Sequence, residues 1–254
     1  MSWQVIGKSV KGTSHTATGN ECEDAARFDI VQDENGDDVL LCCASDGAGS
    51  ALYAAEASAT VTQEVVKRMA AWLQSGKELD ESAVYAVLED VYDILQKQAT
   101  AVEAELNDFS CTLLGCCIAP AQAIFFQLGD GAIARLTDSG YAHIWWPDNG
   151  EYQNATSFLI DDPNFGSLKI LVLDEPVDEV ALFTDGLQML ALNYEQQQIH
   201  QPFFNALFPS LRLADAAEKR TILNRRLEEY LDSTAINART DDDKTLLLAT
   251  RLKA

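Results

Sequence analysis

The segment LLCCASDGAGS, residues 40–50, is an apolar run that ends on an Asp-Gly pair and continues in small residues. Two further apolar runs, residues 124–131 and 180–186, end on the same pair. We interpret each run as a buried strand that delivers one carboxylate to its end, where glycine allows the backbone to turn sharply. Three such strands can build a site for a hard cation.

The composition is strongly acidic, with 40 acids against 18 bases and a net charge of −22. This excess argues against nucleic acid and anionic membrane surfaces as partners. The start, MSWQVIG, lacks the basic and apolar blocks of a secretory signal, and no apolar stretch approaches the roughly 20 residues of a membrane span. We therefore expect a cytoplasmic protein that contacts neither nucleic acid nor membrane, and we expect a monomer.

The six cysteines also favour a cytoplasmic location. Two adjacent pairs, Cys42-Cys43 and Cys116-Cys117, lie inside apolar runs, where cysteine packs as a small hydrophobe. The Cys-x-x-Cys spacing that is typical of zinc sites does not occur. We expect reduced thiols, as is usual in the cytoplasm.

The rest of the chain alternates blocks of strand pattern with blocks of helix pattern. Strands are expected at residues 3–10, 25–31, 39–45, 111–118, 123–128, 132–137, 141–146, 169–173, 179–184 and 245–250, and helices at 50–73, 82–106, 187–192, 202–211 and 214–231. The four strands from 111 to 146 have the spacing of an antiparallel meander. Residues 11–19 are interpreted as a polar loop and 147–167 as a long flap. We predict one α+β domain over residues 1–254, with two antiparallel sheets flanked by helices.

Five acidic positions flank these strands: residues 23–24, 46, 130, 185 and 241–243. Each has a simple explanation when taken alone, because Asp-Gly is a common turn dipeptide and an Asp-Asp-Asp block is usually an exposed turn. Their repetition beside apolar strands, in a chain with three histidines, favours a metal site. Carboxylates with water and a backbone carbonyl suit Mg²⁺ or Mn²⁺ rather than zinc, and they could hold two ions roughly 3.5–4 Å apart.

These motifs resemble those of one enzyme family in their order and spacing. Over essentially its whole length, the chain is similar to the metal-dependent, PPM-type (phosphatase 2C-like) serine/threonine protein phosphatases, in a bacterial-like single-domain form. The motifs that carry the resemblance are Glu23-Asp24, Asp46-Gly47, Ser110-Cys111-Thr112, Gly129-Asp130-Gly131, Asp185-Gly186 and Asp242-Asp243-Lys244-Thr245. Each motif is short, so the specificity lies in their joint order. The resemblance implies an αββα sandwich with a metal site in a cleft at one edge.

The resemblance also implies roles for the metal ligands. Asp46 would bridge two Mn²⁺ or Mg²⁺ ions. Glu23 and the backbone carbonyl of Gly47 would complete the protein ligands of one ion, and Asp185 and Asp242 would hold the other.

Two further acids have implied roles beside these ligands. Asp24 would act in catalysis by orienting metal-bound water, and Asp130 with Asp185 can hold a third, weaker ion. A hydroxide that bridges the two cations would attack the phosphorus in line, so no cysteine or serine nucleophile is required.

Two positions depart from the family pattern. Gly19 stands where many members have an arginine that grips the phosphate, and Ala48 stands where some have a histidine as general acid. Lys11 and His15 are the substrate-binding candidates that could replace the arginine, with Lys8 as a third. His15 is also the catalytic candidate for leaving-group protonation, together with metal-bound water. Both lysines could equally be surface residues, and His15 a hydrogen-bonded loop residue.

We therefore expect a phosphatase that hydrolyses phosphoserine and phosphothreonine in proteins. One alternative is a non-catalytic module that binds a partner through the cleft and the helices, which the glycine at position 19 favours and the retained acids oppose. Another is a phosphatase of a small phosphorylated metabolite, since the flap at 147–167 would shape substrate choice.

Overall fold

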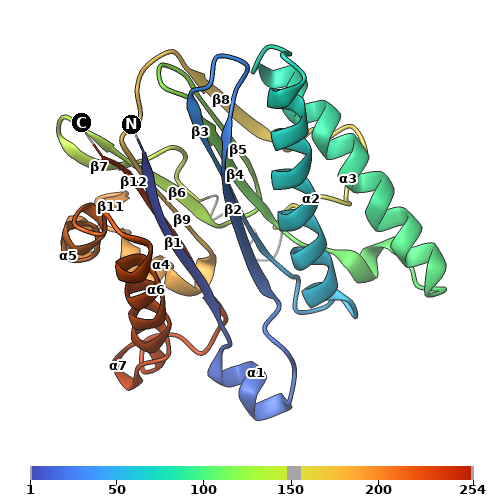
Figure 1. Ribbon diagram of the computed structural model, residues 1–254. Helices are drawn as coiled ribbons and strands as arrows, with labels where there is room; N and C mark the ends of the chain where they lie inside the picture. Colours follow the sequence, from blue (N-terminus) through green and yellow to red (C-terminus); the bar gives the residue numbers. More distant parts are fainter. Residues whose placement is uncertain (1, 148–155, 253–254) are drawn as a thin grey trace.

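Two five-stranded antiparallel sheets pack face to face, and helices cover both outer faces (Figure 1). This computed structural model describes residues 2–147 and 156–252. Helices α2 and α3 lie on one outer face, and α5 and α6 lie on the other (Figure 1). The predicted αββα sandwich is confirmed.

The first sheet has the order β1-β12-β9-β6-β7 and the second has the order β2-β3-β4-β5-β8, while β10 and β11 form a separate pair. The strands are β1 (Trp3–Val10), β2 (Asp24–Gln32), β3 (Asp38–Asp46), β4 (Leu113–Ile118), β5 (Ala123–Leu128), β6 (Ala132–Thr137), β7 (Gly140–His143), β8 (Lys169–Leu173), β9 (Glu179–Phe183), β10 (Leu192–Asn193), β11 (Gln198–Ile199) and β12 (Lys244–Arg251). The helices are α1 (Thr13–Thr18), α2 (Ala54–Gln74), α3 (Glu81–Ala101), η1 (Leu106–Phe109), η2 (Asp185–Leu187), α4 (Gln188–Ala191), α5 (Gln201–Arg212), α6 (Ala217–Leu231) and α7 (Thr234–Asn237).

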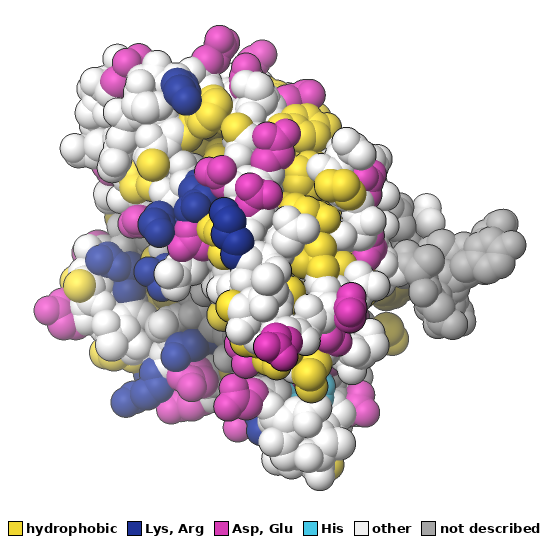
Figure 2. Space-filling model, turned by 90° about the vertical axis from the view of Figure 1, so that its right-hand side faces the viewer, with side chains coloured by type: hydrophobic (Ala, Val, Ile, Leu, Met, Phe, Trp, Pro, Cys, Tyr) yellow, Lys and Arg dark blue, Asp and Glu magenta, His cyan; other side chains and the backbone are white. Residues whose placement is uncertain are grey.

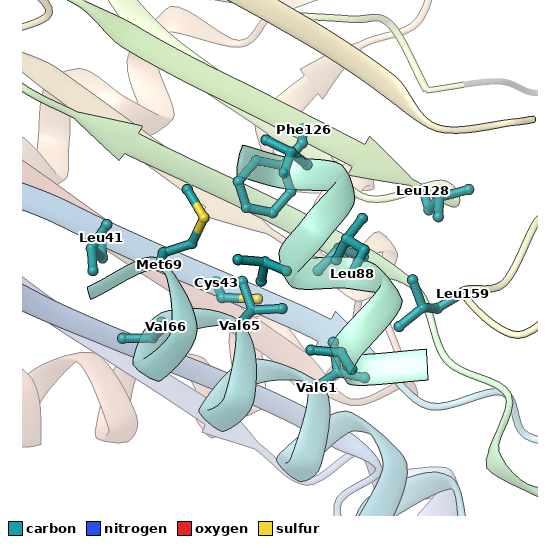
Figure 3. Close-up of a cluster of buried hydrophobic side chains, with 14 of the residues drawn as sticks. Leu41, Cys43, Val61, Val65, Val66, Met69, Leu88, Phe126, Leu128 and Leu159 are labelled. Atoms are coloured by element: carbon teal, nitrogen blue, oxygen red, sulfur yellow. The ribbon is translucent and has the colours of Figure 1, made fainter. Parts of the chain in front are cut away.

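The core lies in three layers, and β3 explains why the opening segment is apolar without alternation. Leu41 and Cys43 face helices α2 and α3, where they join Met69 and Phe126 (Figure 3). Their neighbours Leu40 and Cys42 face the first sheet. Because β3 is buried on both sides, all its central residues are apolar. Burying each large side chain contributes about 1.5–3 kcal/mol, so this strand is a firm support for the acid at its end.

The predicted meander over residues 111–146 is wrong. β4 pairs with β5 in the second sheet, whereas β6 pairs with β7 and β9 in the first. The chain passes between the sheets at Gly129-Asp130-Gly131, where Gly129 has a left-handed φ of 98°. The crossing places Asp130 at the edge where the two sheets meet.

Several other boundaries differ from the prediction, and three of them have a local cause. The loop at 11–19 contains α1, which has no buried residue and therefore no hydrophobic signal. Helix α2 starts at Ala54 instead of residue 50, because the Tyr53 amide donates to the Asp108 carbonyl and the Tyr53 ring stacks on Phe109. Helix α3 stops at residue 101 instead of 106, since Glu103 takes a positive φ of 57°.

Charged side chains of both signs lie on the face shown in Figure 2. On the face that carries α2 and α3, acidic side chains are scattered among Lys and Arg (Figure 2). Within the described ranges, no helix combines the length and the apolar character that crossing a bilayer requires.

Glu179 joins the first sheet to helix α5 through buried hydrogen bonds. Its carboxylate accepts from the Tyr141 hydroxyl at 2.6 Å, from the Thr250 hydroxyl at 2.8 Å, and from Arg212 Nε and Nη2 at 2.6 and 2.7 Å. The residue is 3% exposed. Removing one partner of such a network leaves the others unsatisfied.

We expect Glu179→Ala to lower the free energy of unfolding by about 3 kcal/mol, which corresponds to a Tm loss of roughly 6–12 °C for a chain of this size. The matched control is Glu175→Ala, which breaks the exposed ion pair with Arg135 and should cost less than about 1 kcal/mol. Thermal and urea unfolding of the two variants check this expectation, and equal losses would contradict it.

Candidate metal centre

A cleft of about 230 Å³ opens at one edge of the sandwich. It is lined by His15, Glu23, Asp46, Gly47, Ala48, Gly49, Thr112, Asp130, Thr156, Phe158, Asp185 and Asp242. All six metal-ligand candidates from the sequence are in this set. The structure therefore brings them together, while their roles toward an ion stay predictions.

The strand ends explain this convergence. Asp24 begins β2 and lies directly opposite Asp46, the last residue of β3. Asp185 lies two residues after β9, and Asp242 lies two residues before β12, its neighbour in the first sheet. Each sheet thus contributes acids to the same edge.

Close backbone contacts require glycine beside these acids. A Cβ atom at Gly47 would lie 2.6 Å from the Ala54 carbonyl oxygen, and one at Gly186 would lie 1.9 Å from the Asp243 carbonyl oxygen. Both distances are far below van der Waals contact. The glycines of the Asp-Gly motifs therefore do more than allow a turn: they let backbone segments pack closely beside the cleft.

Asp46 is fixed through its backbone by the neighbouring segment of the same sheet. Its amide donates to the Thr112 hydroxyl at 2.9 Å, and its carbonyl accepts from the Thr112 amide at 2.8 Å. Thr112 was part of a motif in the sequence without an assigned role. Its role here is to position the strand end that carries Asp46.

The carboxyl groups are buried together at a high electrostatic cost. Burial, with the nearby negative charges of Asp130 and Asp242, raises the pKa of Asp185 to about 6. Burial also raises the pKa of Asp24 to about 8, and holds the pKa of Asp46 well above its usual range. Ionised acids at this density need a cation nearby.

Unpartnered oxygens provide the fit test for such a cation. Glu23 Oε2, Asp24 Oδ1 and Asp185 Oδ1 are buried and accept no hydrogen bond. Among the described residues, no group of three or more His, Cys, Asp or Glu side chains is arranged so that it could hold a metal ion as it stands. The case for an ion therefore rests on these oxygens and on the shared cleft. An all-oxygen donor set of this kind fits Mg²⁺ or Mn²⁺.

Asp24 lies beneath the cleft and does not line it. It is 6% exposed and accepts a hydrogen bond from the Thr184 hydroxyl at 2.7 Å. Thr184 in turn accepts from the Thr245 amide at 3.0 Å. Sequence reasoning missed Thr184, which is an ordinary strand residue except that it directly precedes Asp185.

Asp243 makes several hydrogen bonds beside the cleft, and sequence reasoning gave it no role. Its carboxylate is 3% exposed and accepts from the Gly12 amide at 2.6 Å and the Glu23 amide at 2.5 Å, and His15 Nδ1 lies 3.0 Å from its Oδ2. It thereby ties α1 and both flanking loops to the start of β12. The available signal was its place directly before an apolar strand, where a charge needs partners.

The candidates for phosphate binding differ in whether they lie in the cleft. His15 lines the cleft, whereas Lys11 is not among the described residues that do. Lys8 Nζ lies 2.8 Å from Glu228 on α6, so that ammonium is already paired. Gly19 ends α1 with a φ of 81°, a conformation that arginine rarely adopts, which explains the departure at this position.

A second hollow of about 380 Å³ adjoins the cleft and shares Asp130 and Thr156 with it. The Thr156 hydroxyl donates to Asp130 Oδ2 at 2.8 Å. Residues 156–168 contain neither helix nor strand, which agrees with the irregular segment predicted at 147–167. Residues 148–155 of the predicted flap lie outside the described residues.

Known proteins are similar to this chain in sequence and in fold. The model of the family Protein phosphatase 2C matches residues 11–232. Serine/threonine-protein phosphatase 3 of Escherichia coli strain K12 is 34% identical over 250 residues, which cover 98% of each chain. The crystal structure of the serine/threonine phosphatase Stp1 from Staphylococcus aureus superposes with a TM-score of 0.63 at 14% identity, covering 100% of this chain and 96% of that one. RsbX in complex with magnesium gives 0.56 at 17% identity, covering 98% and 94%. The chain belongs to the protein phosphatase 2C family.

Proposed function

We infer that this chain is a serine/threonine protein phosphatase that works with divalent metal ions. The observation that carries the inference is the convergence of five acids on one cleft, with buried carboxylate oxygens that lack hydrogen-bond partners. The name of the Escherichia coli relative, which aligns over 98% of both chains, supports the activity. The magnesium in the structure of RsbX supports the kind of ion.

We assign the ligands as the sequence motifs imply. Asp46 would contact two Mn²⁺ or Mg²⁺ ions, with Glu23 and the Gly47 carbonyl on one and Asp185 and Asp242 on the other. Asp130, together with Asp185, would hold a third ion more weakly. When bound, the ions supply a water of lowered pKa and neutralise charge on the phosphoryl oxygens.

The side chains of the protein define the rest of the chemistry. A phosphate dianion would be repelled by bare carboxylates, so the first task of the acids is to hold positive charge where the phosphate enters. Asp24, which accepts a hydrogen bond from the Thr184 hydroxyl, would orient a metal-bound water through its other carboxylate oxygen, which has no hydrogen-bond partner. Ala48 offers no proton for the leaving group, which leaves water or His15 as the source.

The substrate class follows from the family and from the shape of the site. The hollow that adjoins the cleft at Asp130 and Thr156 offers room beside a phosphorylated side chain, which supports a phosphoprotein over a small metabolite. Residues of the described part of the predicted flap, 156–167, line both hollows. A non-catalytic module is disfavoured, because buried acids without partners are costly unless they bind an ion.

We also propose that residues 1–254 form one domain that acts as a monomer in the cytoplasm. All six cysteines are free, which supports a reducing compartment. Size-exclusion chromatography with light scattering tests the monomer.

The activity is tested on protein stripped of ions with EDTA. Adding Mn²⁺ or Mg²⁺ is expected to restore hydrolysis of p-nitrophenyl phosphate and of a phosphoserine or phosphothreonine peptide, with no turnover before the addition. Small sugar and nucleotide phosphates serve as comparison substrates, and a preference for them would support the metabolite alternative. A chain that binds Mn²⁺ and yet hydrolyses none of these substrates would overturn the proposed function.

A further inference from the structure

His15 occupies a defined position inside the cleft. It lies on α1, its side chain is 17% exposed, and it is held between two carboxylates. Nδ1 is 3.0 Å from Asp243 Oδ2, and Nε2 is 3.8 Å from Glu23 Oε2. The imidazole is therefore oriented by one acid and turned toward the other.

The hydrogen bonds around Asp243 determine which ring nitrogen carries the proton. Asp243 already accepts from the amides of Gly12 and Glu23, one on each carboxylate oxygen, so it acts as an acceptor. Nδ1 of His15 must then donate to it. In the neutral ring this leaves the lone pair of Nε2 on the side of Glu23.

The gap between Nε2 and Glu23 Oε2 lies between the two separations that a pair of ligand atoms takes on one octahedral ion, adjacent or opposite. At 3.8 Å it is too long for a hydrogen bond. Two ligand atoms that each lie about 2.1 Å from one ion are about 3 Å apart at a right angle and about 4.2 Å apart when opposite. Glu23 Oε2 is buried and accepts no hydrogen bond, which is the second observation that points to an ion here.

We propose that His15 Nε2 and Glu23 Oε2 bind the same divalent ion, with Asp243 as the positioning residue that orients the imidazole. The proposal rests on the metal-dependent function inferred above and adds a nitrogen ligand to its all-oxygen set. A carboxylate that holds the far nitrogen of a metal-binding histidine is a common arrangement, because it fixes the tautomer and raises ligand basicity.

Two consequences follow for the chemistry of the site. An imidazole ligand favours Mn²⁺ over Mg²⁺, since Mg²⁺ prefers oxygen ligands. His15 is then unavailable as a phosphate-gripping cation or as an acid, because the ion uses the lone pair of Nε2. The leaving-group proton would come from water alone.

The experiment is electron spin echo envelope modulation on the chain loaded with Mn²⁺. We expect ¹⁴N modulation from a coordinated imidazole, which changes to ¹⁵N modulation when the protein is labelled with ¹⁵N-histidine. The chain has three histidines, so the assignment needs few variants. The modulation should vanish in His15→Gln and persist in the matched control His200→Gln, an exposed residue at the start of α5.

Affinity provides the second readout. His15→Gln should weaken Mn²⁺ binding about 10-fold or more, as measured from the signal of free Mn²⁺, while Mg²⁺ binding changes less than about 3-fold. Asp243→Asn should weaken Mn²⁺ binding in the same direction. If the ¹⁵N-labelled wild-type chain binds Mn²⁺ but shows no histidine modulation, the proposed nitrogen ligand is wrong. The proposed phosphatase function is unaffected by that result, which needs no variant. A chain that binds no Mn²⁺ would overturn both.

Discussion

Replacing Asp46 with asparagine is expected to lower ion-dependent phosphatase turnover at least about 10³-fold, which corresponds to about 4 kcal/mol of transition-state stabilisation. The substitution keeps the size of the side chain and removes one negative charge at the place where both ions would be held. A neutral amide is a poor bridge between two cations, so both ions should bind more weakly. Turnover at saturating Mn²⁺, with isothermal titration of the ion, measures both effects.

Two controls separate this effect from damage to the fold. Asp38→Asn makes the same change at the opposite end of β3, opposite Gln32, and should leave turnover within about 2-fold. Because burial holds the pKa of Asp46 high, the ion-free Asp46→Asn chain should unfold at the same temperature as the wild type or higher. A variant that retains more than a tenth of the activity would contradict the assignment of Asp46 as the bridging ligand.

The stability of the ion-free chain is expected to fall as the pH rises, and bound ions should reverse this trend. The folded-state pKa of Asp185 is about 6 and that of Asp24 is about 8, both above the unfolded value near 3.8, with burial as the main cause. A raised pKa stabilises the fold at pH values below the unfolded pKa, and this stability is lost as the pH rises through the folded pKa. The loss therefore falls between about pH 4 and pH 8.

Thermal unfolding in EDTA should show Tm falling by roughly 5–10 °C from pH 5.5 to pH 8. With saturating Mn²⁺ the ions take the place of the protons, so Tm should rise over the same range. Asp24→Asn should flatten the slope in EDTA, whereas Asp29→Asn, an exposed acid on the same strand, should keep it. An ion-free Tm that stays constant or rises with pH would contradict the expectation.

Much of the fold could be predicted because the sandwich buries several strands on both faces. Strands β1, β5, β6 and β8 have the predicted boundaries. For β5 the reason is clear, since a run of apolar residues between turn residues leaves little freedom. Sheet membership could not be predicted in the same way. The apolar pattern of β5 and β6 indicates only that these strands are buried. They would be equally buried whether they paired with each other or lay in opposite sheets.

The acids of the site were predicted through their joint order, whereas the residues that support them were not. Asp243 contacts Gly12, which is 231 positions away in the chain. No local sequence pattern can indicate a contact between residues so far apart in the chain. The Asp block at 241–243 has the composition of an ordinary exposed turn. Helix α1 has no buried residue, so its sequence lacks the helical spacing of apolar residues. The placement of His15 beside Asp243 could therefore be seen only in three dimensions.

The origin of the acids on both sheets has a mechanical consequence. Glu23, Asp24 and Asp46 are carried by the second sheet, and Asp185 and Asp242 by the first. Asp130 lies on the segment that passes between them. An ion held by Asp46 and Asp185 would therefore join the two layers of the sandwich across their open edge. The spacing of the ions would then be set by how the whole core packs, so a core substitution far from the cleft can change catalysis by shifting one sheet against the other.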